Sequence, residues 1–293
     1  MNKVLDFIRL IRLNNLLIIV ATQIFAYYFL TPSISYKTLL QPSFFALLIS
    51  TFLAAAAGYI INDYMDVMLD LVNKPEKVIV GKSISRRYSM FLHFILNTLS
   101  IGLAFSISKS MAVLVLACVL SLWLYSQFLK KTYLSGNIMV AFLTAFTLWI
   151  LFVYDPNVFK AGIWVYGIFA FITTLQREII KDTEDLRGDS KFKCRTLPIV
   201  LGIRKTKEVL FWLQITLLIL SISFCFSFES LSFSSTNTNK WFLIYMLIAV
   251  IIPMLILAWR IKKADVKNDF SQLSFLSKVI MVTGIISMVF WRF

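Results

Sequence analysis

Long hydrophobic stretches alternate with short polar segments along the entire chain. A helix that spans a bilayer needs about 20 mostly apolar residues, and nine stretches are nearly free of Asp, Glu, Lys and Arg. These stretches are 13–36, 38–62, 88–108, 110–129, 132–154, 161–176, 209–228, 241–259 and 270–291. The sixth is the shortest, and Lys278 interrupts the ninth. The pattern predicts an all-α, polytopic membrane protein: one transmembrane domain over residues 1–293, built as a bundle of nine transmembrane helices.

The composition supports this prediction and excludes a water-soluble domain. Of the 293 residues, 59% are hydrophobic and only 15% are charged, against roughly 45–50% and about 25% in soluble domains. The first stretch follows Lys3, Arg9 and Arg12, as the core of a signal peptide would. Because no small-residue cleavage site is evident and eight more stretches follow, we expect a retained helix.

The charges also predict an orientation. The formal net charge is +14, which in a soluble protein would suggest nucleic acid as a partner. Here most of the basic residues fall into alternate segments, which share one side of the membrane if the N-terminus is cytoplasmic. The positive-inside rule therefore predicts a cytoplasmic N-terminus in the cell membrane. The expected surroundings are a lipid bilayer, with no nucleic acid partner.

Acidic residues are rare, and they gather at the ends of the second and sixth stretches. The clusters are Asn62, Asp63, Asp66 and Asp70, and Asp182, Asp185 and Asp189. Both read D-x-x-D-x-x-x-D, so on a helix the three aspartates of each cluster share an arc of about 60°. Such stripes of like charge are costly, and hard divalent cations relieve the repulsion: oxygen ligands suit Mg²⁺. Pairing with Arg or Lys, or solvation at the membrane boundary, is the alternative.

Basic residues accompany both stripes in the predicted cytoplasmic segments. Lys74, Lys77 and Lys82 follow the first stripe, and Arg177 and Lys181 adjoin the second. This combination suits a diphosphate, because the acids hold metal, the metal holds phosphate, and the bases hold the remaining phosphate oxygens. An apolar bundle accommodates a hydrophobic tail. Positive-inside bias and attraction to anionic lipid are the alternative explanation for the basic residues.

With these two motifs complete, the sequence resembles the UbiA superfamily of intramembrane prenyltransferases. Weaker matches are Arg12 and Asn15, like the family's R-P-x-N, and the segment 125–130 followed by Gly136-Asn137. The stretch 177–189, with Thr196-Leu-Pro198 after it, is most similar to the geranylgeranylglycerol-phosphate geranylgeranyltransferase branch.

The resemblance implies Mg²⁺-dependent transfer of a prenyl group from an isoprenoid diphosphate donor to a lipophilic acceptor, at an active site facing the cytoplasm. It implies that the allylic C–O bond ionises and that the acceptor captures the carbocation. The implied acceptor is geranylgeranylglyceryl phosphate, in ether-lipid synthesis. The expected metal ligands are Asn62, Asp63, Asp66, Asp70, Asp182, Asp185 and Asp189, of which Asp66, Asp70, Asp182 and Asp185 are the expected catalytic residues. The expected substrate-binding residues are Arg12, Asn15, Lys74, Lys77, Lys82, Tyr125, Lys130, Asn137, Arg177, Glu178 and Lys181.

Two alternatives and several departures accompany this interpretation. The acceptor could be aromatic, in quinone or pigment synthesis, and the acids could belong to an ion-coupled transporter. Transporters tend to place such acids near the bilayer midplane, often at broken helices, whereas these lie at predicted helix ends. Lys77 and Val78 stand where the family often has Arg and Pro, and Leu13 stands where it has Pro. Lysine keeps the charge but lacks the bidentate fork of arginine.

Overall fold

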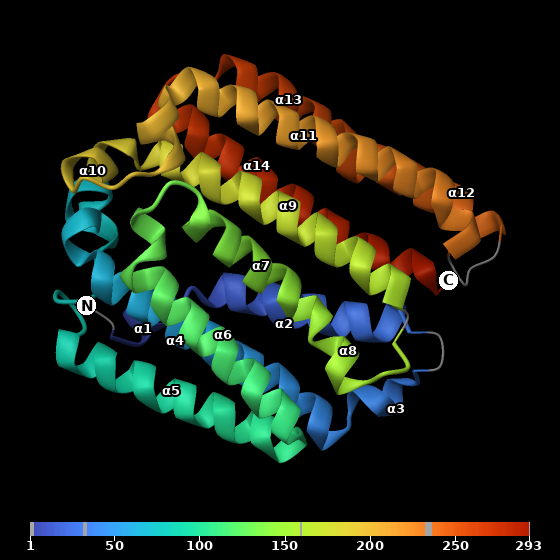
Figure 1. Ribbon diagram of the computed structural model, residues 1–293. Coiled ribbons are helices and arrows are strands. Elements are labelled where there is room, and N and C mark those ends of the chain that lie inside the picture. The colour runs from blue at the N-terminus through green and yellow to red at the C-terminus, as the bar shows by residue number, and fades with distance from the viewer. Residues whose placement is uncertain (1–2, 32–33, 159, 232–235, 293) are drawn as a thin grey trace. The chain divides into compact units, whose positions relative to one another are not determined.

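The computed structural model describes residues 3–31, 34–158, 160–231 and 236–292, and within these ranges the protein is helical throughout (Figure 1). The only β-type pairing in those ranges is an isolated bridge between Val80 and Ile84. The α-helices are α1 (Lys3–Leu10), α2 (Leu13–Phe29), α3 (Tyr36–Leu39), α4 (Pro42–Asn73), α5 (Arg86–Ile107), α6 (Lys109–Gln127), α7 (Ser135–Trp149), α8 (Leu151–Tyr154), α9 (Lys160–Glu184), α10 (Leu186–Lys191), α11 (Leu197–Leu231), α12 (Thr236–Tyr245), α13 (Ile252–Lys263) and α14 (Lys267–Ile286). Short 3₁₀ turns are η1 (Pro75–Lys77), η2 (Leu129–Lys131) and η4 (Ser287–Trp291), and a π-helical turn, η3, covers Met246–Ile251.

Eight helical segments in the described ranges are long and apolar enough to cross a membrane. They are Pro42–Asn73, Arg86–Ile107, Lys109–Gln127, Ser135–Tyr154, Lys160–Glu184, Leu197–Phe228, Lys240–Lys263 and Lys267–Trp291. The prediction of an all-α, multi-pass membrane protein is confirmed. The sixth predicted span, which looked short in the sequence, belongs to a helix of 25 residues that continues through its charged end.

The first predicted span, 13–36, is not one helix. Helix α2 has 17 residues and ends at Phe29, and α3 begins only at Tyr36. The sequence offers a reason, because Pro32 disfavours a helical conformation at the preceding Thr31. At about 1.5 Å per residue, α2 extends for roughly 26 Å, slightly less than the hydrocarbon core. The number of nine spans and the cytoplasmic N-terminus stay predictions.

The chain divides into two compact units, and the first comprises Met1–Ile24, Ser35–Met139 and Arg187–Cys194. Its centre is the packing of α4 on α5 and of both on α6. Pro42 begins α4, where its missing N–H costs no hydrogen bond. Buried Ser50 and Ser100 join α4 to α5, each hydroxyl donating to the other's carbonyl, at 2.9 and 2.8 Å. Gly58 lets α6 approach α4 closely, because a side chain there would meet Leu122.

The second unit comprises Phe25–Ile34, Val140–Leu186 and Arg195–Phe293. Helix α9 packs against both α14 and α11, and α11 packs against α13. The register of α9 on α14 is set by hydrogen bonds of Tyr166, whose hydroxyl lies 2.8 Å from Ser287 Oγ and accepts from Trp291 Nε1 at 3.1 Å. Trp291 is fully buried against the rings of Phe224 and Phe228. These contacts place an aromatic core beside the first turns of α9.

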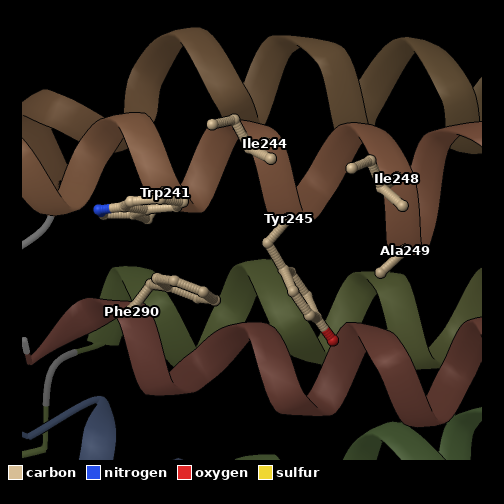
Figure 2. Close-up of a pocket in the computed structure, with 6 residues that line it drawn as sticks. All are labelled: Trp241, Ile244, Tyr245, Ile248, Ala249 and Phe290. Atoms are coloured by element: carbon tan, nitrogen blue, oxygen red, sulfur yellow. The ribbon is translucent and has the colours of Figure 1, made fainter.

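An apolar pocket of about 450 Å³ opens beside this aromatic core (Figure 2). Its lining is Trp241, Ile244, Tyr245, Ile248, Ala249 and Phe290. The Tyr245 ring projects toward the helix opposite, and its hydroxyl donates to the carbonyl of Thr283 at 2.7 Å. Phe290 of the pocket lining is followed by Trp291, which donates to the Tyr166 hydroxyl. Tyr166 precedes Asp182 by 16 residues of α9, or about 24 Å of helix. The pocket can hold hydrocarbon, but it lies far from the acidic motif of α9.

Candidate active site

The first acidic motif lies wholly on helix α4. The predicted span ended at Asn62, but the helix continues to Asn73, so Asp63, Asp66 and Asp70 share one regular backbone. The stripe predicted from the spacing is therefore present. Asp66 is the most buried of the three aspartates, with 4% of its surface exposed. A carboxylate that is this deeply buried requires a cation as its partner.

Arg12 supplies one cation to the stripe. Its guanidinium donates to Asp63 Oδ1 at 2.8 Å and lies over the ring of Tyr59, with Cζ 4.9 Å from the ring centroid. Arg12 occupies the break between α1 and α2 with φ of 52°, which is an unfavourable conformation for a residue with a side chain. The ion pair offsets this strain by holding the start of the chain against the acidic end of α4.

Lys130 supplies the second cation, from turn η2 after helix α6. Its ammonium group pairs with Asp66 Oδ2 and lies 3.4 Å from the side-chain oxygen of Asn62. Burial by itself would lower the pKa of Lys130, but Asp66, Tyr125 and Asp70 outweigh it and raise the pKa above its ordinary value. The predicted residues Asn62, Asp66, Asp70, Tyr125 and Lys130 therefore belong to one electrostatic cluster.

The second acidic motif does not form the continuous stripe that its spacing predicts. Helix α9 ends at Glu184, Asp185 lies in a turn, and Asp189 belongs to the short helix α10. The expectation of two equivalent carboxylate stripes is wrong for this motif. The physical reason lies at Gly188, whose N–H donates to the side-chain oxygen of Asn73 at 2.8 Å. The Asn73 side chain therefore accepts a hydrogen bond from an N–H in the first turn of α10, where the helix has no carbonyl acceptor of its own.

Asn73 and Cys194 are residues of this region that the sequence analysis left without a role. Asn73 ends α4, is buried, and leaves no space for a side chain at position 188. Asp189, next to Gly188, is 6% exposed, and its carbonyl accepts from the N–H of Cys194 at 2.9 Å. Burial, followed by Asp189, raises the pKa of the Cys194 thiol. Asn73 and Gly188 are 115 residues apart in the chain, so no local signal in the sequence pointed to their contact.

Arg177, Glu178 and Lys181 form a separate polar group on α9. Lys181 Nζ lies 2.7 Å from Glu178 Oε1, and Arg177 Nη1 lies 3.3 Å from the same oxygen. Two cations thus share one carboxylate oxygen. The aspartates at positions 182 and 185 follow directly and are partly exposed.

The remaining predicted substrate-binding residues lie on several separate elements. Lys77 and Lys82 are exposed, and Lys82 Nζ donates to the carbonyl of Pro75 at 2.7 Å, which closes the segment after α4. Lys74 caps the end of α4 through its backbone N–H. The N–H of Asn15 bonds the carbonyl of Arg12 at 2.8 Å. Asn137 is buried near the start of α7.

The oxygen-rich residues fit a magnesium ion that binds together with a phosphate ligand. In the described part of the chain, no three His, Cys, Asp or Glu side chains converge as a metal cage. Asp63 and Asp66 are instead neutralised by Arg12 and Lys130. Because Mg²⁺ is usually held by one or two carboxylates plus substrate phosphates, a complete protein cage is not required. Arg12 and Lys130, the cations that pair with these aspartates, are also suited to bind the phosphate.

A model of the UbiA prenyltransferase family matches residues 17–279. The chain belongs to this family of membrane-embedded enzymes and is a prenyltransferase, and the transporter hypothesis is therefore set aside.

The curated relatives are more specific in their names. The digeranylgeranylglyceryl phosphate synthase of Methanosphaera stadtmanae is 38% identical over 173 residues, which cover 58% of this chain and 62% of the relative. The synthase of that name from Saccharolobus solfataricus is 35% identical over 242 residues, 80% of this chain and 79% of the relative. That of Korarchaeum cryptofilum is 30% identical over 240 residues, 81% of each chain. The chain thus spans less than two thirds of the first relative and about four fifths of the other two.

Solved structures confirm the fold. A structure described as a digeranylgeranylglyceryl phosphate synthase in membranes matches with a TM-score of 0.70 at 22% identity, covering 99% of each chain. A UbiA homolog from Archaeoglobus fulgidus, bound to DMAPP and Mg²⁺, matches with a TM-score of 0.61 at 17% identity, covering 97% of this chain and 99% of the other.

Proposed function

We propose that this prenyltransferase moves a geranylgeranyl-type group from an allylic diphosphate to geranylgeranylglyceryl phosphate, in the synthesis of ether lipids. The observation that carries the proposal is the electrostatic cluster at the end of α4, where a buried aspartate is paired with Lys130. The names of the curated relatives supply the acceptor class. The prenyl diphosphate and Mg²⁺ bound to the Archaeoglobus fulgidus homolog support the donor class and the metal.

We assign the metal to the seven residues of the two motifs, Asn62, Asp63, Asp66, Asp70, Asp182, Asp185 and Asp189. When bound, Mg²⁺ supplies positive charge against the negative charge that develops on a departing diphosphate. Lys130 and Arg12 add fixed cations at the acidic end of α4, and we assign Lys74, Lys77 and Lys82 to the outer phosphate oxygens. Preorganised cations lower the barrier because they need no reorganisation as the charge develops.

The proposed chemistry breaks the allylic C–O bond, and its electron pair leaves with the diphosphate. The hydroxyl oxygen of the acceptor then bonds to the allylic carbon and loses its proton. An apolar helical bundle excludes water, which would otherwise capture the carbocation. We further propose that the acidic ends of α4 and α9 face the cytoplasm, a placement supported by the basic segments that adjoin them.

The test is an assay of detergent-purified protein with Mg²⁺ and geranylgeranyl diphosphate. One reaction contains geranylgeranylglyceryl phosphate, and parallel reactions contain 4-hydroxybenzoate or 1,4-dihydroxy-2-naphthoate. We expect a doubly alkylated glycerol phosphate, detected by mass spectrometry, and no product when EDTA replaces Mg²⁺. A prenylated aromatic product would instead keep the mechanism and assign the protein to quinone or pigment synthesis. No product from any acceptor, with the folded protein verified, would contradict the proposal.

A further inference from the structure

A strongly basic surface lies at one end of the second unit, where helix α13 ends and helices α11 and α14 begin. Helix α11 packs against α13, and α13 packs against α14, so these three ends are neighbours. Seven bases and three acids lie there: Arg204, Lys205, Lys207, Glu208, Arg260, Lys262, Lys263, Asp265, Lys267 and Asp269. The surface therefore carries more positive than negative charge.

The acids at the end of α9 do not cancel this excess. Helix α9 packs against both α11 and α14, and its end with the following turn contributes two bases and four acids. These are Arg177, Glu178, Lys181, Asp182, Glu184 and Asp185. Arg177 and Lys181 already pair with Glu178, and Arg195, just before α11, adds one more base. With all of these residues included, bases still outnumber acids at this end of the unit.

Aromatic side chains mark the level at which this surface meets the apolar helices. Trp212 on α11 and Trp259 on α13 are 67% and 57% exposed, and each lies within four positions of a charged residue along its helix. Exposed tryptophans of this kind are typical of the membrane–water interface. Lys262 Nζ lies 4.0 Å from the ring centroid of Phe211, and Lys263 Nζ lies 4.0 Å from that of Trp259. The cations therefore lie at the level expected for lipid headgroups.

Three of the cations gather where α11 packs on α13. Arg204, Lys207 and Phe211 are spaced i, i+3 and i+7, so they share an arc of about 60° on α11. This face is turned toward the end of α13, because Lys262 lies over Phe211 and Lys207 pairs at 2.9 Å with Asp265, just beyond α13. Lys207 thus has an acidic partner, whereas Arg204 and Lys262 make no ion pair with any described residue.

We propose that Arg204 and Lys262 bind the phosphate of an anionic phospholipid from the surrounding bilayer, with Lys207 beside them. Guanidinium and ammonium groups form charge-assisted hydrogen bonds with phosphate oxygens, and clustered bases next to membrane helices attract anionic lipid. The occupant is a lipid because the cations lie beside exposed tryptophans, at the boundary of helices that lipid chains surround. A zwitterionic headgroup would bring its own cation against the basic surface, so a net negative headgroup fits better. This lipid site is separate from prenyl transfer and does not depend on the acceptor.

The experiment measures lipid binding by native mass spectrometry of the detergent-purified protein. Phosphatidylglycerol and phosphatidylcholine with identical chains are titrated separately. We expect the wild-type protein to bind phosphatidylglycerol at least about tenfold more tightly. Arg204→Met and Lys262→Met each remove one charge and keep an unbranched side chain, and we expect each to reduce that preference by about threefold to tenfold. Lys262→Arg is expected to retain most of it.

Lys205→Met is the matched control for a site as opposed to a diffuse surface charge. Lys205 is exposed and adjoins Arg204 in the chain, but on the helix it lies about 160° around from Lys207. We expect its preference to stay within about twofold of wild type, and phosphatidylcholine binding and gel-filtration behaviour to be unchanged in all variants. An equal loss in Lys205→Met and Arg204→Met would overturn the site, as would equal binding of both lipids by the wild-type protein. Displacement of phosphatidylglycerol by excess soluble glycerol phosphate would overturn the assignment to a lipid.

Discussion

The first acidic motif lies on one uninterrupted helix, α4, whereas the second is divided among α9, a turn at Asp185 and α10. The same D-x-x-D-x-x-x-D spacing thus has two different backbones. The charges nearby differ as well: Arg12 and Lys130 pair with the aspartates of α4, while on α9 Arg177 and Lys181 pair with Glu178. Equal spacing in the sequence therefore does not give the two motifs the same surroundings. Carboxylates held on one regular helix, with fixed cations beside them, suit a metal that carries a diphosphate.

The largest effect is expected from removing one carboxylate charge in either motif. Asp66→Asn and Asp185→Asn keep the size of each side chain but lose an anionic oxygen, and we expect kcat/KM to fall by at least about 1,000-fold. Product formation by mass spectrometry measures this, with membrane insertion and gel-filtration behaviour unchanged. Asp265→Asn is the matched control, because the Asp265 side chain is exposed and its carboxylate pairs with Lys207. Near-normal activity in Asp66→Asn or Asp185→Asn would refute the proposed metal site.

A smaller but still large effect is expected at Lys130. Lys130→Met leaves buried Asp66 without its ammonium partner, and we expect kcat to fall by about 100-fold, with partial recovery in Lys130→Arg. Lys131→Met is the control, because Lys131 is exposed and the ion pair with Asp66 is made by Lys130. If Lys130→Met and Lys131→Met had equal activities, the fixed cation at the end of α4 would have no part in transfer.

The smallest effect is expected at the contact that separates α10 from α9. Gly188→Ala places a methyl group against the Asn73 side chain, which displaces the segment that carries Asp189. We expect the Mg²⁺ concentration for half-maximal activity to rise by about threefold to tenfold. Gly102→Ala is the control, because position 102 on α5 has open space. The double variant Gly188→Ala with Asn73→Ala removes the overlap, and partial recovery is expected there; unchanged Mg²⁺ dependence in Gly188→Ala would contradict the positioning role of Asn73.

The sequence by itself determined the environment of this protein and most of its chemistry. Nearly uncharged stretches of membrane-spanning length fix an all-helical membrane fold, because only internally bonded backbone is stable in lipid. The position of Asp63, Asp66 and Asp70 on one helix face follows from helix periodicity. Their pairing with Arg12 and Lys130 could not be read from spacing, because both cations lie more than 50 residues away in the chain.

Only the tertiary structure decided where regular helices stop and which distant residues meet. The break in the second motif depends on a hydrogen bond between Asn73 and Gly188, which the local sequence cannot specify. Likewise, Lys278 read as an interruption of an apolar span, and it acquired a neighbour in Arg177 only when α14 packed on α9. Helix periodicity is a local property of the backbone, whereas these contacts arise from side chains brought together by packing between helices.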